Sequence, residues 1–175
     1  MRILITTAAL LIAGLPQVAS AANGDIGCIE SKLGANAMTR IGDGVIAAID
    51  KGGNPNASLD ADRTALIAAR DACVRDNKWS VAASQAAMSY TQARAARIGV
   101  EKALKKESVD LTSLNFAYSA LPVADRESLI AKMSPRALAA IRKVAGANAA
   151  MRRHVALYFA ALAAFEFYPA EFAAA

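Results

Sequence analysis

The sequence contains only one histidine, His154, and two cysteines, Cys28 and Cys73. Zinc sites are built mainly from several cysteine and histidine ligands, so this composition argues against a zinc centre. A covalently bound haem requires the motif Cys-x-x-Cys-His, which is absent. A catalytic serine or cysteine would depend on His154 as its base. The scarcity of these residues thus argues against the common metal centres and nucleophilic enzymes.

Glycine-rich phosphate-binding motifs and strand-like runs are also missing from the sequence. The pair Asp60 and Asp62 does not continue as a calcium loop, because the required glycine and distant glutamate are absent. Two such carboxylates could serve an acid–base enzyme, but at the start of a helix they are typical capping residues. We therefore expect a non-catalytic protein without a metal or cofactor, and keep a small helical enzyme of unknown reaction as an alternative.

The first 21 residues have the pattern of a signal peptide. A positively charged start, Met1-Arg2, precedes the apolar run Ile3–Leu15, and Ala19-Ser20-Ala21 fits the small-x-small cleavage pattern. The apolar run is shorter than the roughly 20 residues of a membrane-spanning helix. We expect residues 1–21 to be removed and the protein to be periplasmic or secreted; a retained N-terminal anchor is the alternative.

The two cysteines predict a disulfide between Cys28 and Cys73, because exported proteins with an even number of cysteines usually oxidise them. Two buried thiols are the alternative. The bond would connect the start of the first expected helix to the end of the second, which is the arrangement of an antiparallel helical hairpin.

Residues 22–175 are expected to form a single α-helical domain. Alanine is abundant and runs of β-branched residues are few, which favours helix over strand. Hydrophobic residues make up 55% of the chain, too many for a disordered protein, and no long linker divides it. The sequence therefore predicts an all-α bundle of about six or seven helices, whose N-terminal hairpin is held by the disulfide.

Apolar periodicity, capping residues and helix breakers predict the boundaries of the helices. The expected ranges are about 25–51, from Ser58 or Asp60 to 77, 79–106, 112–121, 124–133, 135–146 and 148–168. Gly34, Gly42 and Gly44 weaken the first helix, so a kink or a close helix contact is expected there. Arg97 interrupts the apolar seam of the third helix and is expected where that seam opens to water. Pro169 is expected to end the last helix.

The C-terminal segment from Arg152 to Phe172 allows three interpretations. A membrane span is disfavoured because the uncharged run ends at Glu166, and peripheral attachment to anionic lipid is an alternative. A non-covalent haem between His154 and Met88 is a second interpretation that no motif supports. The third is a buried core helix, because six of the ten aromatic residues lie between Tyr158 and Phe172. We expect the core helix and no transmembrane segment in the mature chain.

Positive charge is concentrated in one part of the sequence. Between Ser128 and Phe165 there is no acidic residue, whereas there are six basic ones: Lys132, Arg136, Arg142, Lys143, Arg152 and Arg153. Cations near the end of a helix interact favourably with its dipole, but Arg152 and Arg153 follow the expected helix start at Asn148.

A helix start that carries two guanidinium groups can bind an anion. The sequence therefore predicts an anion-binding or partner-binding site around Asn148, Arg152, Arg153 and His154. The alternative is pairing with an Asp or Glu from another helix.

These features predict an exported, non-catalytic helical protein that binds another protein or an anionic surface. Nucleic acid is not an expected partner of an exported chain with so few aromatic residues outside the core. A carrier of a small apolar ligand, with its pocket among the aromatic residues of the last helix, is the alternative.

Overall fold

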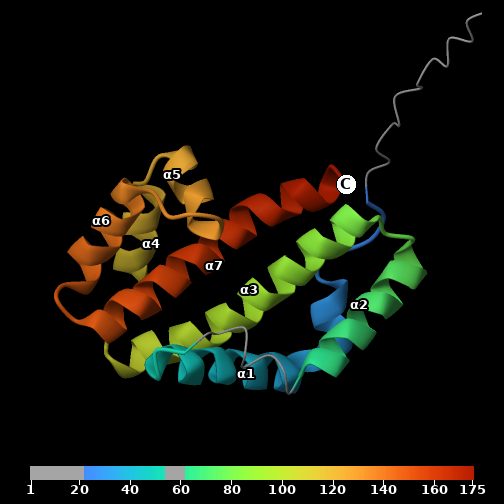
Figure 1. The fold of residues 1–175 in the computed structure, drawn as a ribbon, viewed down its shortest axis with the longest axis horizontal. Helices are drawn as coiled ribbons and strands as arrows, with labels where there is room; N and C mark the ends of the chain where they lie inside the picture. Colours follow the sequence, from blue (N-terminus) through green and yellow to red (C-terminus); the bar gives the residue numbers. More distant parts are fainter. Residues whose placement is uncertain (1–21, 54–61) are drawn as a thin grey trace, which may run out of the picture.

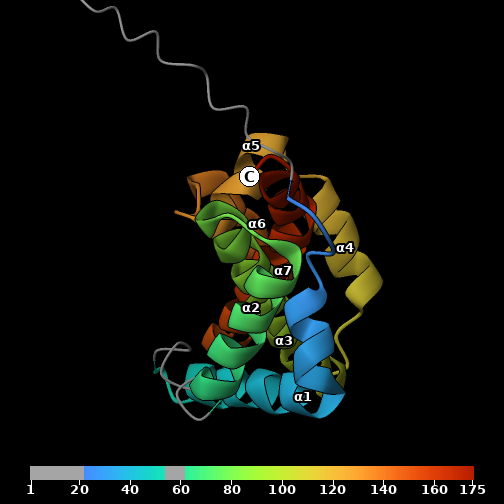
Figure 2. The same cartoon turned by 90° about the vertical axis from the view of Figure 1, so that its right-hand side faces the viewer.

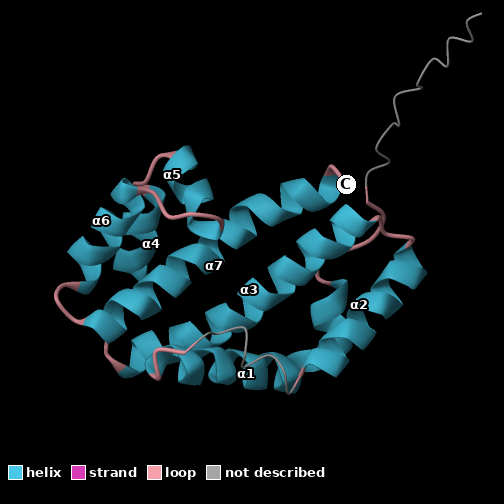
Figure 3. Ribbon diagram, in the orientation of Figure 1, coloured by secondary structure: helices cyan, strands magenta, loops and turns pink. Residues whose placement is uncertain are grey.

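The computed structural model describes residues 22–53 and 62–175 as a packed helical bundle (Figures 1 and 3). The described residues form α1 (Cys28–Asp50), α2 (Arg63–Asn77), α3 (Val81–Lys106), α4 (Leu111–Ser119), α5 (Val123–Glu127), α6 (Pro135–Ala145) and α7 (Ala149–Ala173), with a 3-10 turn at Ser128–Ile130. No strand occurs in these two ranges, so the all-α prediction is confirmed. The predicted signal peptide and the proposed caps Ser58 and Asp60 lie outside the described residues.

Four helices begin at the residues that their capping side chains predict. The side-chain oxygens of Ser80, Ser134 and Asn148 each accept a hydrogen bond from the backbone N–H three residues later. Asp110 accepts from the N–H groups of both Thr112 and Ser113. Each bond satisfies a donor that the first helical turn leaves without a partner, so local sequence defines the starts of α3, α4, α6 and α7.

The long helix α3 is the centre of the bundle (Figure 1). It packs along α7 on one side and along α1 on the other, and these are the two most extensive helix contacts. The shorter elements α4 to α6 gather around the first part of α7, while α2 lies beside the start of α1 (Figure 2).

Helices α1 and α3 touch through their backbones where Gly42 meets Gly99. A Cβ atom added to either glycine would collide with backbone atoms of the opposite helix. The expected close contact is therefore present at Gly42, and the expected kink is present at Gly34, where φ is 76°.

The disulfide between Cys28 and Cys73 is formed, as predicted, and joins the start of α1 to α2. Beside it, the Trp79 indole meets the Phe172 ring edge-on at 5.1 Å between centroids. The Trp79 Nε1–H also donates a 2.6 Å hydrogen bond to the carbonyl of Asn23. These contacts bring the first described residues and the C-terminus to the same end of the bundle (Figure 1).

The core-helix prediction for the C-terminal segment is confirmed. Val155, Tyr158 and Phe159 are fully buried, and Tyr158 donates a 2.9 Å hydrogen bond to the side-chain oxygen of Asn115 on α4. Leu157 and the other large apolar residues of this segment are buried or half-buried. The segment is thus sheltered by α3 and α4 to α6 rather than exposed.

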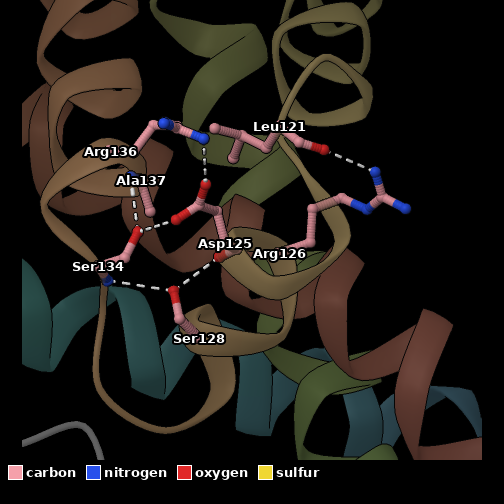
Figure 4. Close-up of polar contacts among 7 residues, drawn as sticks. All are labelled: Leu121, Asp125, Arg126, Ser128, Ser134, Arg136 and Ala137. Carbon is pink, nitrogen blue, oxygen red and sulfur yellow. Dashed lines mark hydrogen bonds and ion pairs between the residues drawn. The ribbon is translucent and has the colours of Figure 1, made fainter.

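Two predicted boundaries are wrong. Helix α7 continues through Pro169 to Ala173, because Phe172 packs against Trp79 and holds the last turns in place although proline contributes no N–H donor. The expected helix at 124–133 is divided into α5 and the 3-10 turn. There the Ser128 hydroxyl donates to the carbonyl of Asp125 and accepts from the backbone N–H of Ser134, which turns the chain toward α6 (Figure 4).

Replacing both Cys28 and Cys73 with serine should lower the free energy of unfolding by about 4 kcal/mol, because the bond closes a loop of 45 residues in the unfolded chain. Chemical denaturation of the wild type and the double variant measures the difference. A loss below about 1 kcal/mol would show that the bond contributes little.

Gly42→Ala should destabilise the protein by about 1–3 kcal/mol, because the added methyl group forces α1 away from α3. In an ordinary helix the same change stabilises by about 1 kcal/mol, so the sign of the effect tests the backbone contact. Thermal and urea unfolding provide the measurement; an increase in stability would contradict the close crossing.

Candidate anion-binding site at the basic end of the bundle

Four helix ends meet at one end of the bundle: the C-terminal ends of α1, α3 and α6 and the N-terminal end of α7. Asp50 of α1, Lys106 of α3 and His154 of α7 line one hollow of about 220 Å³. Helix α6 joins this group because only the short connection 146–148 separates it from α7. This region is called the basic end, and its cations are Lys51, Lys105, Lys106, Arg142, Lys143, Arg152 and Arg153.

The predicted site residues Asn148 and Arg152 stabilise the turn between α6 and α7. The Asn148 side chain caps α7 by accepting a 3.1 Å hydrogen bond from the backbone N–H of Met151. The Arg152 guanidinium donates to the carbonyls of Gly146 and Ala147, at 3.3 Å and 3.2 Å. Arg152 thus donates hydrogen bonds to carbonyl groups at the end of α6 instead of pairing with an acid. These bonds explain why an arginine occurs in the first turns of α7.

Arg153 is exposed and makes no hydrogen bond or ion pair with any residue in the described ranges. It lines a second hollow, of about 340 Å³, together with Ile49, Gly52 and Met133. The internal acidic partner that was the alternative to an anion site is therefore not found for Arg153 among the described residues. Of the four predicted site residues, Arg153 is the one that is available to a ligand.

His154 is buried and its Nε2 lies 2.9 Å from the Asp50 carboxylate of α1. The alternative of pairing with an acid from another helix is thus realised for His154. Asp50 was missed by sequence reasoning, because nothing in the sequence indicates that the end of α1 meets the start of α7. This pair links the two helices and removes His154 from the candidate anion-binding groups.

The structure gives no support to a haem between His154 and Met88. His154 lines the same hollow as Gly99 and Lys102 of α3. Met88 is three turns away along that helix, roughly 16 Å from Gly99, and packs in the apolar clusters near the disulfide. In the described ranges, no group of three histidine, cysteine or acidic side chains is placed to hold a metal ion.

Most cations away from the basic end are paired with carboxylates, although Arg75 and Lys78 at the end of α2 have no ion pair with a described residue. These ion pairs are Lys32–Asp76, Arg40–Asp62, Arg70–Asp71, Arg94–Glu30, Arg97–Glu101, Lys102–Asp43, Arg126–Glu166 and Arg136–Asp125. Arg97 is one-third exposed and also lies over the Phe165 ring, so the seam opens to water there as expected, but a carboxylate on its own helix accompanies it. Five other pairs connect different helices, so these charges contribute to the packing of the bundle.

Glu166, Arg126 and Tyr118 form a polar cluster that fastens α5 and α4 to α7. Arg126 donates to both carboxylate oxygens of Glu166, and Tyr118 donates a 2.7 Å hydrogen bond to one of them. The Arg126 guanidinium lowers the pKa of Glu166, whereas burial and the bond to Glu166 raise the pKa of Tyr118. The cluster therefore holds an ionised glutamate between two donors, which is a structural role.

A second polar cluster, between α5 and α6, is also structural (Figure 4). The Ser134 hydroxyl donates a 2.6 Å hydrogen bond to Asp125 and accepts from the backbone N–H of Ala137. Arg136 approaches the other carboxylate oxygen of Asp125 at 3.3 Å. The serine hydroxyl is thus engaged in capping α6 and has no histidine beside it to act as a base.

No family model matches this chain, and no curated protein or solved structure shows significant similarity to it. The interpretation of the site therefore depends on its own geometry. By length and composition, α7 is the one helix in the described ranges that could cross a membrane, a criterion that buried core helices also meet. The absence of a transmembrane segment stays a prediction.

Glu166→Gln should lower the free energy of unfolding by about 1–2 kcal/mol at neutral pH, because it removes the charge that Arg126 and Tyr118 engage. Since the folded protein lowers the pKa of Glu166, this contribution is present above the ordinary glutamate pKa and disappears as the pH falls through the lowered value. Melting temperatures of both proteins across the acid range provide the measurement. A difference that grows on acidification would contradict this account.

Proposed function

We propose that this chain is an exported, non-catalytic helical protein whose basic end binds a partner carrying clustered negative charge, either an acidic protein surface or an anionic membrane surface. The observation that carries the proposal is the separation of paired from unpaired cations. Along the sides of the bundle, most lysines and arginines are paired with carboxylates, with Arg75 and Lys78 at the end of α2 as exceptions, whereas the exposed cations of the basic end have no ion pair with a described residue.

Unpaired cations from three different helices lie at the same end of the bundle (Figure 1). Lys105 and Lys106 end α3, Arg142 and Lys143 end α6, and Arg153 lies in the first turns of α7. All five are exposed. The dipoles at the ends of α3 and α6 favour these lysines and arginines, so folding tolerates a concentration of like charge. A negatively charged partner would find these cations unneutralised and solvent-accessible.

The few acidic groups at this end compensate only part of the positive charge. Asp50 is engaged by His154. Asp110 accepts hydrogen bonds from the Ser113 hydroxyl and from the backbone N–H groups at the start of α4, and these bonds lower its pKa. Glu107 is exposed and has no ion pair with a described residue. The excess positive charge thus remains at the surface of the basic end.

The disulfide supports the exported location. Disulfides persist in oxidising environments outside the cytoplasm, and the bond between Cys28 and Cys73 is compatible with such an environment. Together with the signal-peptide pattern of residues 1–21, this supports a periplasmic or secreted protein. A small-ligand carrier and a small enzyme stay alternatives without a specific observation in their favour.

The test removes two cations of the basic end, in the variant Arg142→Gln/Lys143→Gln. Binding to vesicles of phosphatidylglycerol and phosphatidylcholine, and to an acidic polypeptide such as polyglutamate, is measured at increasing salt. Each cation contributes about 1 kcal/mol to the free energy of binding at an anionic surface. The double variant should therefore bind whichever of the two probes the wild type binds roughly thirtyfold more weakly. Binding of the wild type should fall as salt screens the attraction.

A matched control is available at the end of α2. Arg75→Gln/Lys78→Gln removes the same charge from exposed residues that also lie near a helix C-terminus and form no ion pair with a described residue. This control should bind like the wild type. Equal weakening by both double variants, or no binding of the wild type to either probe, would refute the proposal, while the choice of probe distinguishes a membrane from an acidic protein.

A further inference from the structure

A narrow groove follows α7 where this helix lies beside α3 (Figure 1). The hollow of about 340 Å³ at Arg153 is continued by a second hollow of about 450 Å³, because Leu157 and Ala160 line both. The second hollow is bounded by Gln92 of α3 and by Ile130 of the 3-10 turn, and both of these elements pack on α7. The two hollows together are called the α7 groove.

The shape of the α7 groove suits an extended chain and excludes a helix. Ala161 and Ala164 line its floor but are buried, so a helix about 10 Å wide cannot reach them. Between Arg153 and Tyr168 the groove follows 15 residues of α7, which is about 22 Å. An acyl chain in a bilayer spans half of the hydrocarbon core, about 15 Å, and would therefore fit within this length.

The end of the groove at Arg153 combines an apolar lining with a single cation. Ile49, Met133 and Ala156 contribute apolar groups, and Arg153 is the one charged residue among the described residues that line this hollow. Its guanidinium is exposed and has no hydrogen bond or ion pair with a described residue. Because a guanidinium binds phosphate through charge-assisted hydrogen bonds, the chemistry here suits a ligand with an apolar tail and an anionic head group.

We propose that the α7 groove binds the acyl chain of an anionic membrane phospholipid, whose phosphate is bound by Arg153. This inference rests on the proposed function, because it selects an anionic membrane over an acidic protein as the partner of the basic end. A peptide at the apolar lining would leave its backbone N–H and C=O groups without partners, whereas an acyl chain has no polar group to satisfy. Val144 is exposed between Lys143 and the end of α6, and apolar residues next to cations are typical of surfaces that lie at a membrane interface.

The wild type itself provides the first test. Isothermal titration calorimetry measures the binding of lysophosphatidylglycerols with hexanoyl to decanoyl chains, at concentrations at which these lipids are monomeric. The affinity should rise about twofold to fourfold for each added methylene group, because the groove removes that group from water. Glycerol phosphate, the head group without a chain, should bind much more weakly than the decanoyl lipid. Equal affinities along the series would overturn the proposal.

Arg153→Gln tests the contact with the head group. This variant should bind decanoyl lysophosphatidylglycerol at least roughly tenfold more weakly than the wild type, because it loses a charge-assisted hydrogen bond. Its binding of monodecanoylglycerol, which has the same chain and no charge, should be unchanged. Arg75→Gln removes an exposed arginine of α2 that has no ion pair with a described residue, and should bind both lipids like the wild type. Equal effects of the two substitutions would contradict the assigned role of Arg153.

Ala160→Phe tests the groove at its centre. The added ring occupies the place where the two hollows join, so both decanoyl lipids should bind at least roughly tenfold more weakly. Ala82→Phe adds the same ring to an exposed position near the start of α3 and should leave binding unchanged. Circular dichroism and thermal unfolding check that each variant folds. If Ala160→Phe does not fold, the chain-length series and Arg153→Gln decide the outcome.

The results distinguish a failure of this inference from a failure of the proposed function. A wild type that binds polyglutamate or phosphatidylglycerol vesicles through Arg142 and Lys143, but binds decanoyl lysophosphatidylglycerol no better than glycerol phosphate, would overturn the groove site alone. A wild type that binds neither vesicles nor polyglutamate would refute the proposed function. That result would also overturn the lipid proposal, because a membrane phospholipid must be bound at the surface of its bilayer.

Discussion

The backbone contact between Gly42 of α1 and Gly99 of α3 is the constraint on which the rest of the bundle depends. Because neither residue carries a side chain, the backbones of the two helices come into contact there, and α3 also packs along α7. The position of α7 then determines where His154 meets Asp50 and where Glu166 meets Arg126. The core, the polar clusters and the basic end all follow from the way α1 and α7 both pack along α3 and meet at the basic end.

Electrostatics divides this molecule into two parts with different roles. Along its sides, pairs such as Arg94–Glu30 and Lys102–Asp43 connect neighbouring helices, and most lysines and arginines there have a partner within the fold. At the basic end, cations lie near helix C-termini, where they interact favourably with the helix dipoles but are not neutralised by carboxylates. Lysines and arginines therefore support helix packing along the sides, whereas at the basic end they leave an unneutralised positive charge. This excess positive charge is the physical basis of the proposed binding of an anionic partner.

The sequence was sufficient to predict the fold class, the disulfide and most helix boundaries, because these depend on local signals: alanine content, apolar periodicity and caps such as Ser134 and Asn148. The sequence was not sufficient to predict the tertiary contacts. The extension of α7 past Pro169 depends on Trp79, which is distant in sequence, and the partner of His154 could not be identified before α1 was placed. In the candidate site, the basic cluster was visible in the sequence, but which arginine caps carbonyls and which stays available is decided by three-dimensional packing.

Trp79 holds Ala22 and Ala175 close together, because it donates a hydrogen bond to Asn23 and its ring contacts Phe172. Both ends of the described chain therefore lie at the opposite end of α7 from Arg153. An affinity tag, a surface linker or a fused protein attached at either position would therefore point away from the cations. Immobilisation through either of these positions would present Arg142, Lys143 and Arg153 outward, in an orientation in which a captured partner has unhindered access.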